Sequence, residues 1–485
     1  MRVSEQFHLG ITQPSLDFVD VDTATDLSAF IDPRAIRLQK GPFAEHAQAL
    51  LTSFFSALLE ALSRGNSSEA ATLMAHLGEP NETHLGFSHG RSRGRGLGGV
   101  GAGRVLEYLR RSRASQTGML QDLEDSALLV PGIGKDITSD IATHVLRQAL
   151  IDYTQRTCIE LGVELEEQFA GAVWSADNLE WTDQFALLPR SHESEMLLLV
   201  PKVIVRHSLI FDKDKYWRDY LAPSLVDNEL RLGSELVRLL KHGTPHVDKK
   251  AIKDKYGNTK PDVVDQTEKF PKALDQYRSV AGLGRVVPDH SEVTEITSTP
   301  PVDYNGLLLA IQAIAAGQYG ASSYHRAVRD LLSALFFPAL SNCRIECEIH
   351  EKRKRIDIAF DNVADIGFFR WVGQHYGAPT VPVECKNYSH DPANPELDQM
   401  IGRLSRDRGR LGIIVCRELQ NKELFWRRCR DTAKDGNGFI LVLDDLDLRE
   451  LVDAASVGDA KFEHVSMAAR LEYPALRRQF GRLIA

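Results

Sequence analysis

The pattern of apolar and polar residues in the last third of the chain alternates between helical spacing and short apolar runs. Helices are expected where apolar residues recur every three or four positions, at 305–318, 322–335, 396–408 and 422–432. Strands are expected where β-branched and other apolar residues gather, at 344–350, 355–360, 380–386, 411–416 and 438–443. This succession predicts an α/β (α+β) fold, with helices around a mixed sheet. Residues 361–378 form an insertion that we expect to be partly helical.

The first two-thirds of the chain have a mainly helical pattern. It predicts helices at 42–64, 104–113, 135–161 and 216–277, a mobile basic glycine-rich loop at 85–103, and one buried strand at 195–205, interrupted by Pro201. Residues 285–301 are polar, contain prolines and lack periodicity, which is typical of a linker. We therefore expect an N-terminal recognition or regulatory region at 1–285, a linker at 286–302 and a second domain at 303–485.

Composition narrows the class of protein. The 485 residues are 43% hydrophobic and 26% charged, which is typical of a globular protein with two or three domains. No apolar run approaches the ~18 residues that cross a bilayer, and the first residues lack the layout of a secretory signal. We therefore expect a cytoplasmic protein with no membrane partner. The six cysteines form no C-x-x-C pair, which argues against disulfides and a structural zinc site.

The charge balance argues against a protein that binds nucleic acid over its whole surface, because the formal net charge is -9. Residues 344–430 differ from this average, with 16 Lys and Arg against 13 Asp and Glu. A polyanion would be expected to dock there, although a solvated surface of mixed charge has the same composition.

Two of the expected strands carry charged residues inside apolar sequence. Side chains alternate between the faces of a strand, so Glu384 and Lys386 share one face while Val383 and Cys385 share the other. Asp357 lies between two isoleucines on another strand. Burial of the apolar neighbours would direct two carboxylates and one ammonium group to the open face of the sheet.

These residue types suit the hydrolysis of a phosphodiester. Such a reaction needs an activated water and stabilisation of the negative charge that develops on the phosphate. Mg²⁺, or Mn²⁺ in its place, prefers oxygen ligands, so Asp357, Glu384 and the backbone carbonyl of Cys385 are the expected metal ligands. Lys386 would orient or deprotonate the water. We accordingly predict Asp357, Glu384 and Lys386 as catalytic residues.

The order of Asp357, the Glu384-Cys385-Lys386 triplet and a following helix with Gln399 resembles the PD-(D/E)XK restriction-endonuclease-like nucleases, especially their Mrr-like branch. The resemblance covers the C-terminal third. It implies a Mg²⁺-dependent endodeoxyribonuclease in which Gln399 supports Lys386 or contacts the substrate backbone. A restriction or anti-phage (antiviral) defence role, with separate defence-system partner proteins, is also implied by the resemblance.

Three features depart from the family pattern. Ile356 precedes Asp357 where the family name has proline, and 27 positions separate Asp357 from Glu384. The glutamate that the family often carries on the helix before the sheet is replaced by His325, with Asp330 one turn further on. His325 and Asp330 are therefore candidates for accessory roles.

Several residues near the triplet are candidates for contact with nucleic-acid phosphates. They are Asn387, Tyr388, Arg403, Arg406 and Arg355, the last within a basic stretch at 352–355. A solvated charged surface is the alternative for this set. DNA is the expected substrate, but the residues do not exclude RNA. A double-strand break needs two such centres, so we expect a homodimer. Two further alternatives are a non-catalytic nucleic-acid-binding or assembly protein on the same fold, and a surface ion pair between Glu384 and Lys386.

A weaker resemblance lies in the N-terminal part. Residues 129–141 resemble the turn of a helix-hairpin-helix, in which backbone amides hold a DNA phosphate, although a glycine turn before a structural helix has the same pattern.

Overall fold

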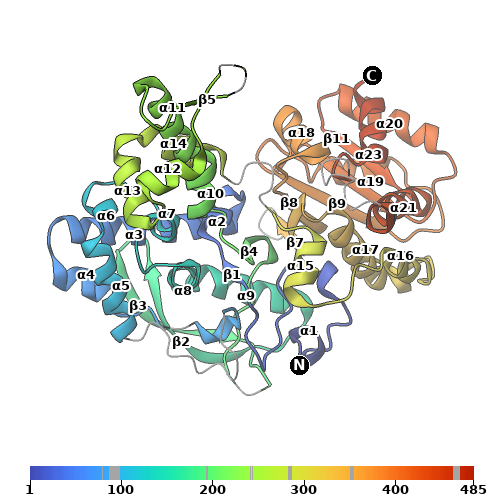
Figure 1. The fold of residues 1–485 in the computed structure, drawn as a ribbon. Coiled ribbons are helices and arrows are strands. Elements are labelled where there is room, and N and C mark those ends of the chain that lie inside the picture. The colour runs from blue at the N-terminus through green and yellow to red at the C-terminus, as the bar shows by residue number, and fades with distance from the viewer. Residues whose placement is uncertain are drawn as a thin grey trace.

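A computed structural model of the chain describes residues 1–78, 80–86, 99–192, 195–240, 242, 244–281, 287–349, 354–461 and 470–485. The chain builds a larger N-terminal part and a C-terminal part that contains the main sheet (Figure 1). Within the described ranges, no helix is long and apolar enough to cross a membrane. Most of the expected basic glycine-rich loop, residues 87–98, lies outside the described residues, as do 352 and 353 of the expected basic stretch.

Helices dominate the N-terminal part. They are α1 Val3–Gln6, α2 Pro33–Leu38, α3 Pro42–Ser63, α4 Ser67–Met74, α5 Gly99–Arg111, α6 Arg113–Gln116, α7 Leu123–Leu129, α8 Lys135–Val145, α9 Arg147–Leu161, α10 Lys213–Tyr216, α11 Ala222–Leu232, α12 Lys249–Tyr256, α13 Lys260–Lys269, α14 Pro271–Val280 and α15 His290–Thr297. Between α10 and α11 the chain forms one π-helical stretch, Trp217–Leu221.

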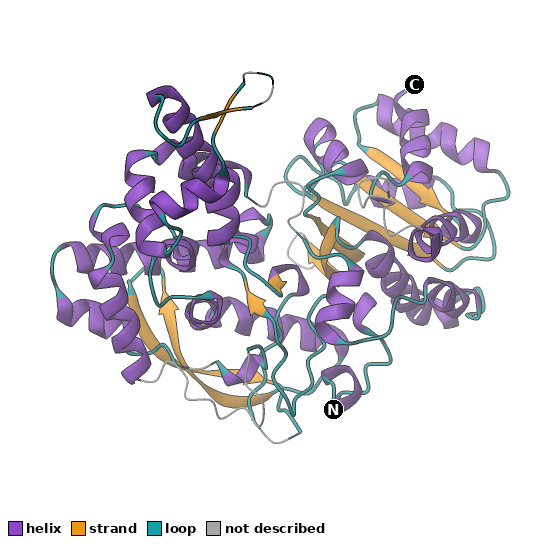
Figure 2. Cartoon of the chain, viewed as in Figure 1, coloured by secondary structure: helices purple, strands orange, loops and turns teal. Residues whose placement is uncertain are grey.

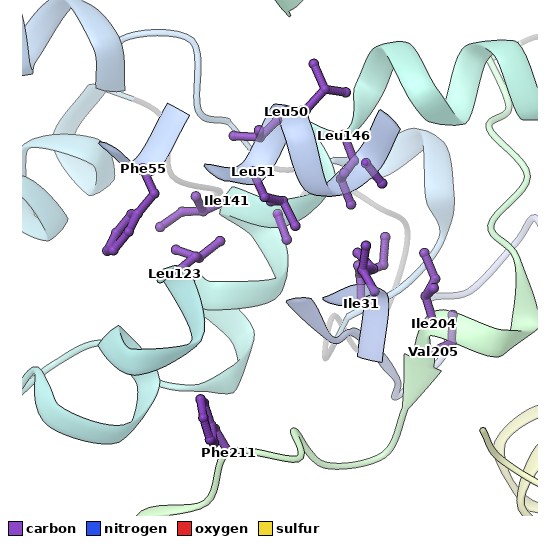
Figure 3. Packing of buried hydrophobic residues seen from close by; sticks show 14 of the residues in the cluster. Ile31, Leu50, Leu51, Phe55, Leu123, Ile141, Leu146, Ile204, Val205 and Phe211 are labelled. Carbon is purple, nitrogen blue, oxygen red and sulfur yellow. The ribbon is translucent and has the colours of Figure 1, made fainter. Parts of the chain in front are cut away.

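The strands of the N-terminal part form three separate two-stranded ribbons, all antiparallel. β1 Phe30–Ile31 pairs with β4 Val205–Arg206, β2 Glu166–Ser175 with β3 Glu180–Leu188, and β5 Arg238–Leu239 with β6 Pro245–His246. One hydrophobic cluster joins segments that are distant in sequence, and Figure 3 shows Ile31, Leu51, Leu123, Ile141 and Val205 among its members. This burial, rather than a continuous sheet, holds the N-terminal part together.

The C-terminal part is built on one five-stranded sheet with the order β11-β10-β9-β8-β7. β9, β10 and β11 are parallel, whereas β8 runs antiparallel to both β7 and β9. The strands are β7 Leu340–Ile349, β8 Lys354–Asn362, β9 Thr380–Lys386, β10 Leu411–Cys416 and β11 Phe439–Leu443. The helices are α16 Tyr304–Gln312, α17 Ala321–Phe336, α18 Gly367–Tyr376, α19 Asn394–Ile401, α20 Lys422–Lys434, α21 Asp445–Lys461 and α23 Pro474–Ile484.

Helices cover both faces of this sheet. α16 and α17 lie on one side, and α18, α20 and α23 lie on the other (Figure 1). Figure 2 shows the strands enclosed between these helices. Every residue of β10 is buried, as the continuous apolar sequence of a central parallel strand requires. The expected α/β (α+β) class is therefore confirmed.

The two parts have separate hydrophobic cores that meet near the end of α17. The core residues of the second cluster begin at Tyr304, whereas the first cluster includes Val293 and Ile296 of α15. Across the junction, the His290 ring lies 2.8 Å from the Ala334 carbonyl oxygen, and Lys202 Nζ lies 4.1 Å from the centre of the Phe337 ring. The expected linker at 286–302 thus contains a helix that packs on the N-terminal core.

Three other expectations about secondary structure are wrong in part. Residues 195–205 are mostly buried, but they form no continuous strand: Met196 and Pro201 make isolated bridges, Lys202–Ile204 is a 3-10 helix, and β4 begins only at Val205. The helix expected at 396–408 ends at Ile401, before Gly402. The region expected to be helical at 216–277 is interrupted by the β5–β6 ribbon. The β2–β3 ribbon was not expected, because Phe169, Phe185 and Leu187 are exposed on it and conceal the alternation.

Candidate active site

The antiparallel register of β8 and β9 brings two acidic residues to opposite positions. Ile358 pairs with Val383, so the next positions, Asp357 and Glu384, lie across from one another. Asp357 Oδ2 accepts a 2.8 Å hydrogen bond from the backbone N–H of Cys385. Val383 and the Cys385 side chain are buried in the C-terminal core, as the alternation predicts. Burial of these neighbours turns the two carboxylates toward the opposite face.

The Glu384 carboxylate lies at the centre of a buried polar network. Its side chain is fully buried. Oε2 lies 3.3 Å from Lys386 Nζ and accepts a 2.6 Å hydrogen bond from Gln399 Nε2, while Oε1 accepts a 3.1 Å bond from Arg403 Nε. Gln399 Oε1 also accepts a 2.9 Å hydrogen bond from Lys386 Nζ. Gln399 therefore bridges the amine of Lys386 and the carboxylate of Glu384.

The electrostatic balance of this network is set by burial and by charge. Burial raises the pKa of the Glu384 carboxyl, and the nearby Asp357 carboxylate raises it further. Lys386 and Arg403 act in the opposite direction and lower it. Two cations thus face two carboxylates, of which Glu384 is fully buried and Asp357 is 19% exposed.

Of the two residues predicted as accessory, only His325 lies beside the network. Its Nε2 is 3.9 Å from Asp357 Oδ2, and α17 positions it there. Asp330 contacts Arg329 instead, with 2.7 Å between Oδ1 and Nε, and burial raises the pKa of its carboxyl. Asp330 has no described contact with Asp357 or Glu384.

The residues predicted to contact nucleic acid have different surroundings. Asn387 is buried, and its amide nitrogen donates 2.9 Å hydrogen bonds to the carbonyls of Ala315 and Gly317. This side chain therefore anchors the turn between α16 and α17. Tyr388 is 36% exposed and stacks on the His390 ring, with 5.0 Å between ring centres, so it is open to a ligand.

The three arginines of that set also differ. Arg406 is exposed, and Arg355 is exposed but pairs with Glu346 at 2.9 Å. Arg403 is buried against Glu384, a contact that the analysis of the sequence did not anticipate. Arg403 lies in the turn after α19, which ends at Ile401, so helical spacing from Gln399 does not account for this contact and the sequence carries no clear signal for it.

The donor set suits a hard divalent cation. Within the described ranges, no group of three or more His, Cys, Asp and Glu side chains has the arrangement of a metal site. The available oxygens are those of Asp357 and Glu384 and the backbone carbonyl of Cys385. Mg²⁺ is commonly bound by one or two carboxylates while it keeps several waters, so this set fits Mg²⁺ or Mn²⁺. Burial raises the pKa of the Cys385 thiol well above its usual range, so the thiol is a poor metal ligand.

Comparison with known proteins adds little about chemistry. Residues 8–212 match a family model described as a domain of unknown function, DUF8370. No curated protein and no solved structure matches the chain. The matched segment belongs to the N-terminal part and ends before the strands that carry Asp357 and Glu384.

Proposed function

We propose that the C-terminal part is a metal-dependent endonuclease that hydrolyses phosphodiester bonds of DNA, with Asp357, Glu384 and Lys386 as its catalytic residues. The observation that carries the proposal is the convergence of these three groups from β8 and β9, with Gln399 joining the carboxylate to the amine. The order of helices and strands around them resembles the PD-(D/E)XK nucleases.

Each residue of the network would have a distinct task. Asp357, Glu384 and the Cys385 carbonyl would hold the cation, which would lower the pKa of a bound water and stabilise charge on the phosphate. Lys386 Nζ, fixed by Glu384 and Gln399, would orient the attacking water and oppose the negative charge that grows on the phosphate. Because the amine is already held in place, less free energy would be needed to orient it during the reaction, and the activation barrier would be lower.

Burial argues for function over stability as the reason for this network. A fully buried carboxylate with two cations is often no more stabilising than apolar residues of similar size. Carboxyl groups with shifted pKa values cluster at functional sites, and burial raises the pKa of the Glu384 carboxyl. A structural ion pair at the surface would not need a fully buried Glu384 with every oxygen engaged.

The wider biological role is proposed on the resemblance alone. It is that of a cytoplasmic restriction or anti-phage defence effector in which the N-terminal part targets or restrains the nuclease. A homodimer would supply the two centres needed for a double-strand break.

One observation favours a second candidate, a non-catalytic nucleic-acid-binding protein. Arg403 already occupies Glu384 Oε1, the oxygen that a metal ion would otherwise share. In a protein that never binds metal, this arginine would be a permanent counter-ion.

The test is cleavage of plasmid DNA and of RNA by the purified chain with Mg²⁺ or Mn²⁺. The variants Asp357→Ala and Lys386→Ala should each lose about 10²–10⁴-fold in rate. Asp431→Ala and Lys434→Ala, at exposed positions of α20, serve as matched controls and should cut like the unmodified protein. DNA binding without cutting by any form would favour the second candidate, and cutting of RNA alone would make the protein a ribonuclease.

A further inference from the structure

The β5–β6 ribbon forms an exposed arm on the N-terminal part. α11 ends at Gly233, whose φ of +58° turns the chain out of the helix. Arg238 then pairs with His246 and Leu239 with Pro245, after which α12 begins at Lys249. The ribbon extends away from the helices that carry it, at the top of the view in Figures 1 and 2.

The arm presents leucines to solvent. Leu239 is 73% exposed and Leu240 is 50% exposed. Leu232, at the end of α11, is 65% exposed. Covering this apolar surface would stabilise a complex by about 25 cal/mol for each Å² removed from water. Three largely exposed leucines within nine residues of the chain mark this segment as a candidate contact surface.

The same segment is strongly basic within an acidic protein. Residues 231–260 contain eight Lys and Arg against three Asp and Glu, a balance of +5, while the rest of the chain carries -14. Lys255 pairs with Glu229, and Lys260 donates to the carbonyl oxygens of Val130 and Ile133. Arg238, Lys250 and Lys253 are exposed and have no acidic partner among the described contacts. These three cations are available to a polyanion.

The cations around the candidate active site, by contrast, are mostly engaged within the chain. Among the described residues there, Arg403 pairs with Glu384, Arg355 with Glu346, and Arg344 Nη2 with Asp361 Oδ1 at 2.7 Å. A nuclease needs many phosphate contacts to hold a duplex, because these supply most non-specific affinity. Among the described residues the site offers few exposed cations, Arg406 among them, so a second basic surface would add affinity.

We propose that the arm, formed by β5 and β6, is a duplex DNA-binding element together with the adjoining α12. Arg238, Lys250 and Lys253 would contact phosphates, and Leu239 and Leu240 would lie against the groove. A two-stranded ribbon has the width to enter the major groove, and apolar side chains at its end would be covered there. The choice of DNA as the polyanion rests on the proposed nuclease function, but the binding itself does not depend on cleavage.

The test is fluorescence anisotropy with a labelled duplex and the full chain, in the non-cleaving Lys386→Ala background. The triple variant Arg238→Gln, Lys250→Gln, Lys253→Gln should bind at least about tenfold more weakly. It should also lower the slope of log K against log salt by one to three, because each lost phosphate contact removes about one counterion. A matched control, Lys272→Gln, Arg427→Gln, Lys434→Gln, removes the same charge at exposed positions and should change neither quantity appreciably.

The leucines are tested separately. Leu239→Ser with Leu240→Ser should weaken binding several-fold at every salt concentration without a change in slope, since no charge is removed. Equal binding by the arm variant and its control would overturn the proposal. Tighter binding of an RNA duplex than of a DNA duplex of the same sequence, in the same assay, would also overturn it. Cleavage is measured separately, with the chain that keeps Lys386. Arm-dependent binding together with no cleavage by that chain would remove the nuclease function and leave the arm. Cleavage by that chain together with unchanged binding by the arm variant would remove the arm and leave the nuclease function.

Discussion

Replacement of Arg403 by methionine probes the buried network most sharply. Arg403 Nε lies 3.1 Å from Glu384 Oε1, and the side chains are 10% and 0% exposed. Methionine fills similar space but leaves that oxygen without its cation. Breaking a buried ion pair from one side costs about 3–5 kcal/mol. Because Lys386 and Gln399 still satisfy the other oxygen, we expect a loss near the lower end, about 3 kcal/mol in the free energy of unfolding.

The assay is urea unfolding of Arg403→Met, Glu384→Gln and the double variant, without divalent metal. The double variant should lose less than the sum of the single variants, with a coupling energy of about 2 kcal/mol. Arg406→Met, at an exposed neighbouring position, is the control and should change stability by less than about 0.5 kcal/mol.

Metal provides the second half of the same experiment. If Glu384 is a ligand, Mg²⁺ supplies the positive charge that Arg403→Met removes, so added Mg²⁺ should stabilise this variant more than the unmodified protein. Asp357→Ala should abolish that extra stabilisation. Strictly additive losses in the cycle would refute the reasoning, because they would mean that Arg403 and Glu384 do not interact in solution.

Three other changes test separate parts of the account. Gln399→Leu should lower the cleavage rate about 10–100-fold in a plasmid assay while duplex affinity is kept, since the residue supports groups that touch the reacting atoms; a proportional loss of affinity would contradict this. Asn387→Ala should lower the melting temperature, because each of two carbonyls left unsatisfied costs about 1–3 kcal/mol; an unchanged melting curve would contradict it. Burial raises the pKa of Glu124 to about 7, so its proton is held more tightly in the folded chain, and stability falls as pH rises from about 4.5 through 7. The free energy of unfolding should therefore fall by about 3 kcal/mol less in Glu124→Gln than in the unmodified protein when both are denatured at pH values across this range. Equal falls in the two proteins would contradict this.

The sheet was the most predictable element of the fold. β9 and β10 have the bounds expected from the sequence, 380–386 and 411–416. β10 is a continuous apolar run, and in β9 the apolar residues Val381, Val383 and Cys385 alternate with other residues. The expected partly helical insertion contains α18. The spacing of apolar residues was sufficient to predict an element wherever the buried positions follow the same period.

Elements governed by distant contacts were not predictable. Residues 195–205 are as apolar as a strand, yet most have no ladder partner, and their place is determined by packing against other parts of the N-terminal core. Arg403 looks like a helix-surface arginine in the sequence. Only the end of α19 at Ile401 and the turn at Gly402 bring it against Glu384. Alternation along the strand predicted that Glu384 and Lys386 share one face. The position of Asp357 opposite Glu384 depends on the register between β8 and β9, which the pattern along a single strand does not give.

The most direct test of the central claim follows the oxygen that attacks the phosphate. Duplex DNA is cleaved by the purified chain with Mg²⁺ in ¹⁸O-labelled water, and the product phosphates are analysed by mass spectrometry. Hydrolysis at a centre formed by Asp357, Glu384 and Lys386 predicts one labelled oxygen at each new phosphate end, and no product with Lys386→Ala. Product that appears equally with Lys386→Ala, or ends without label, would contradict the account.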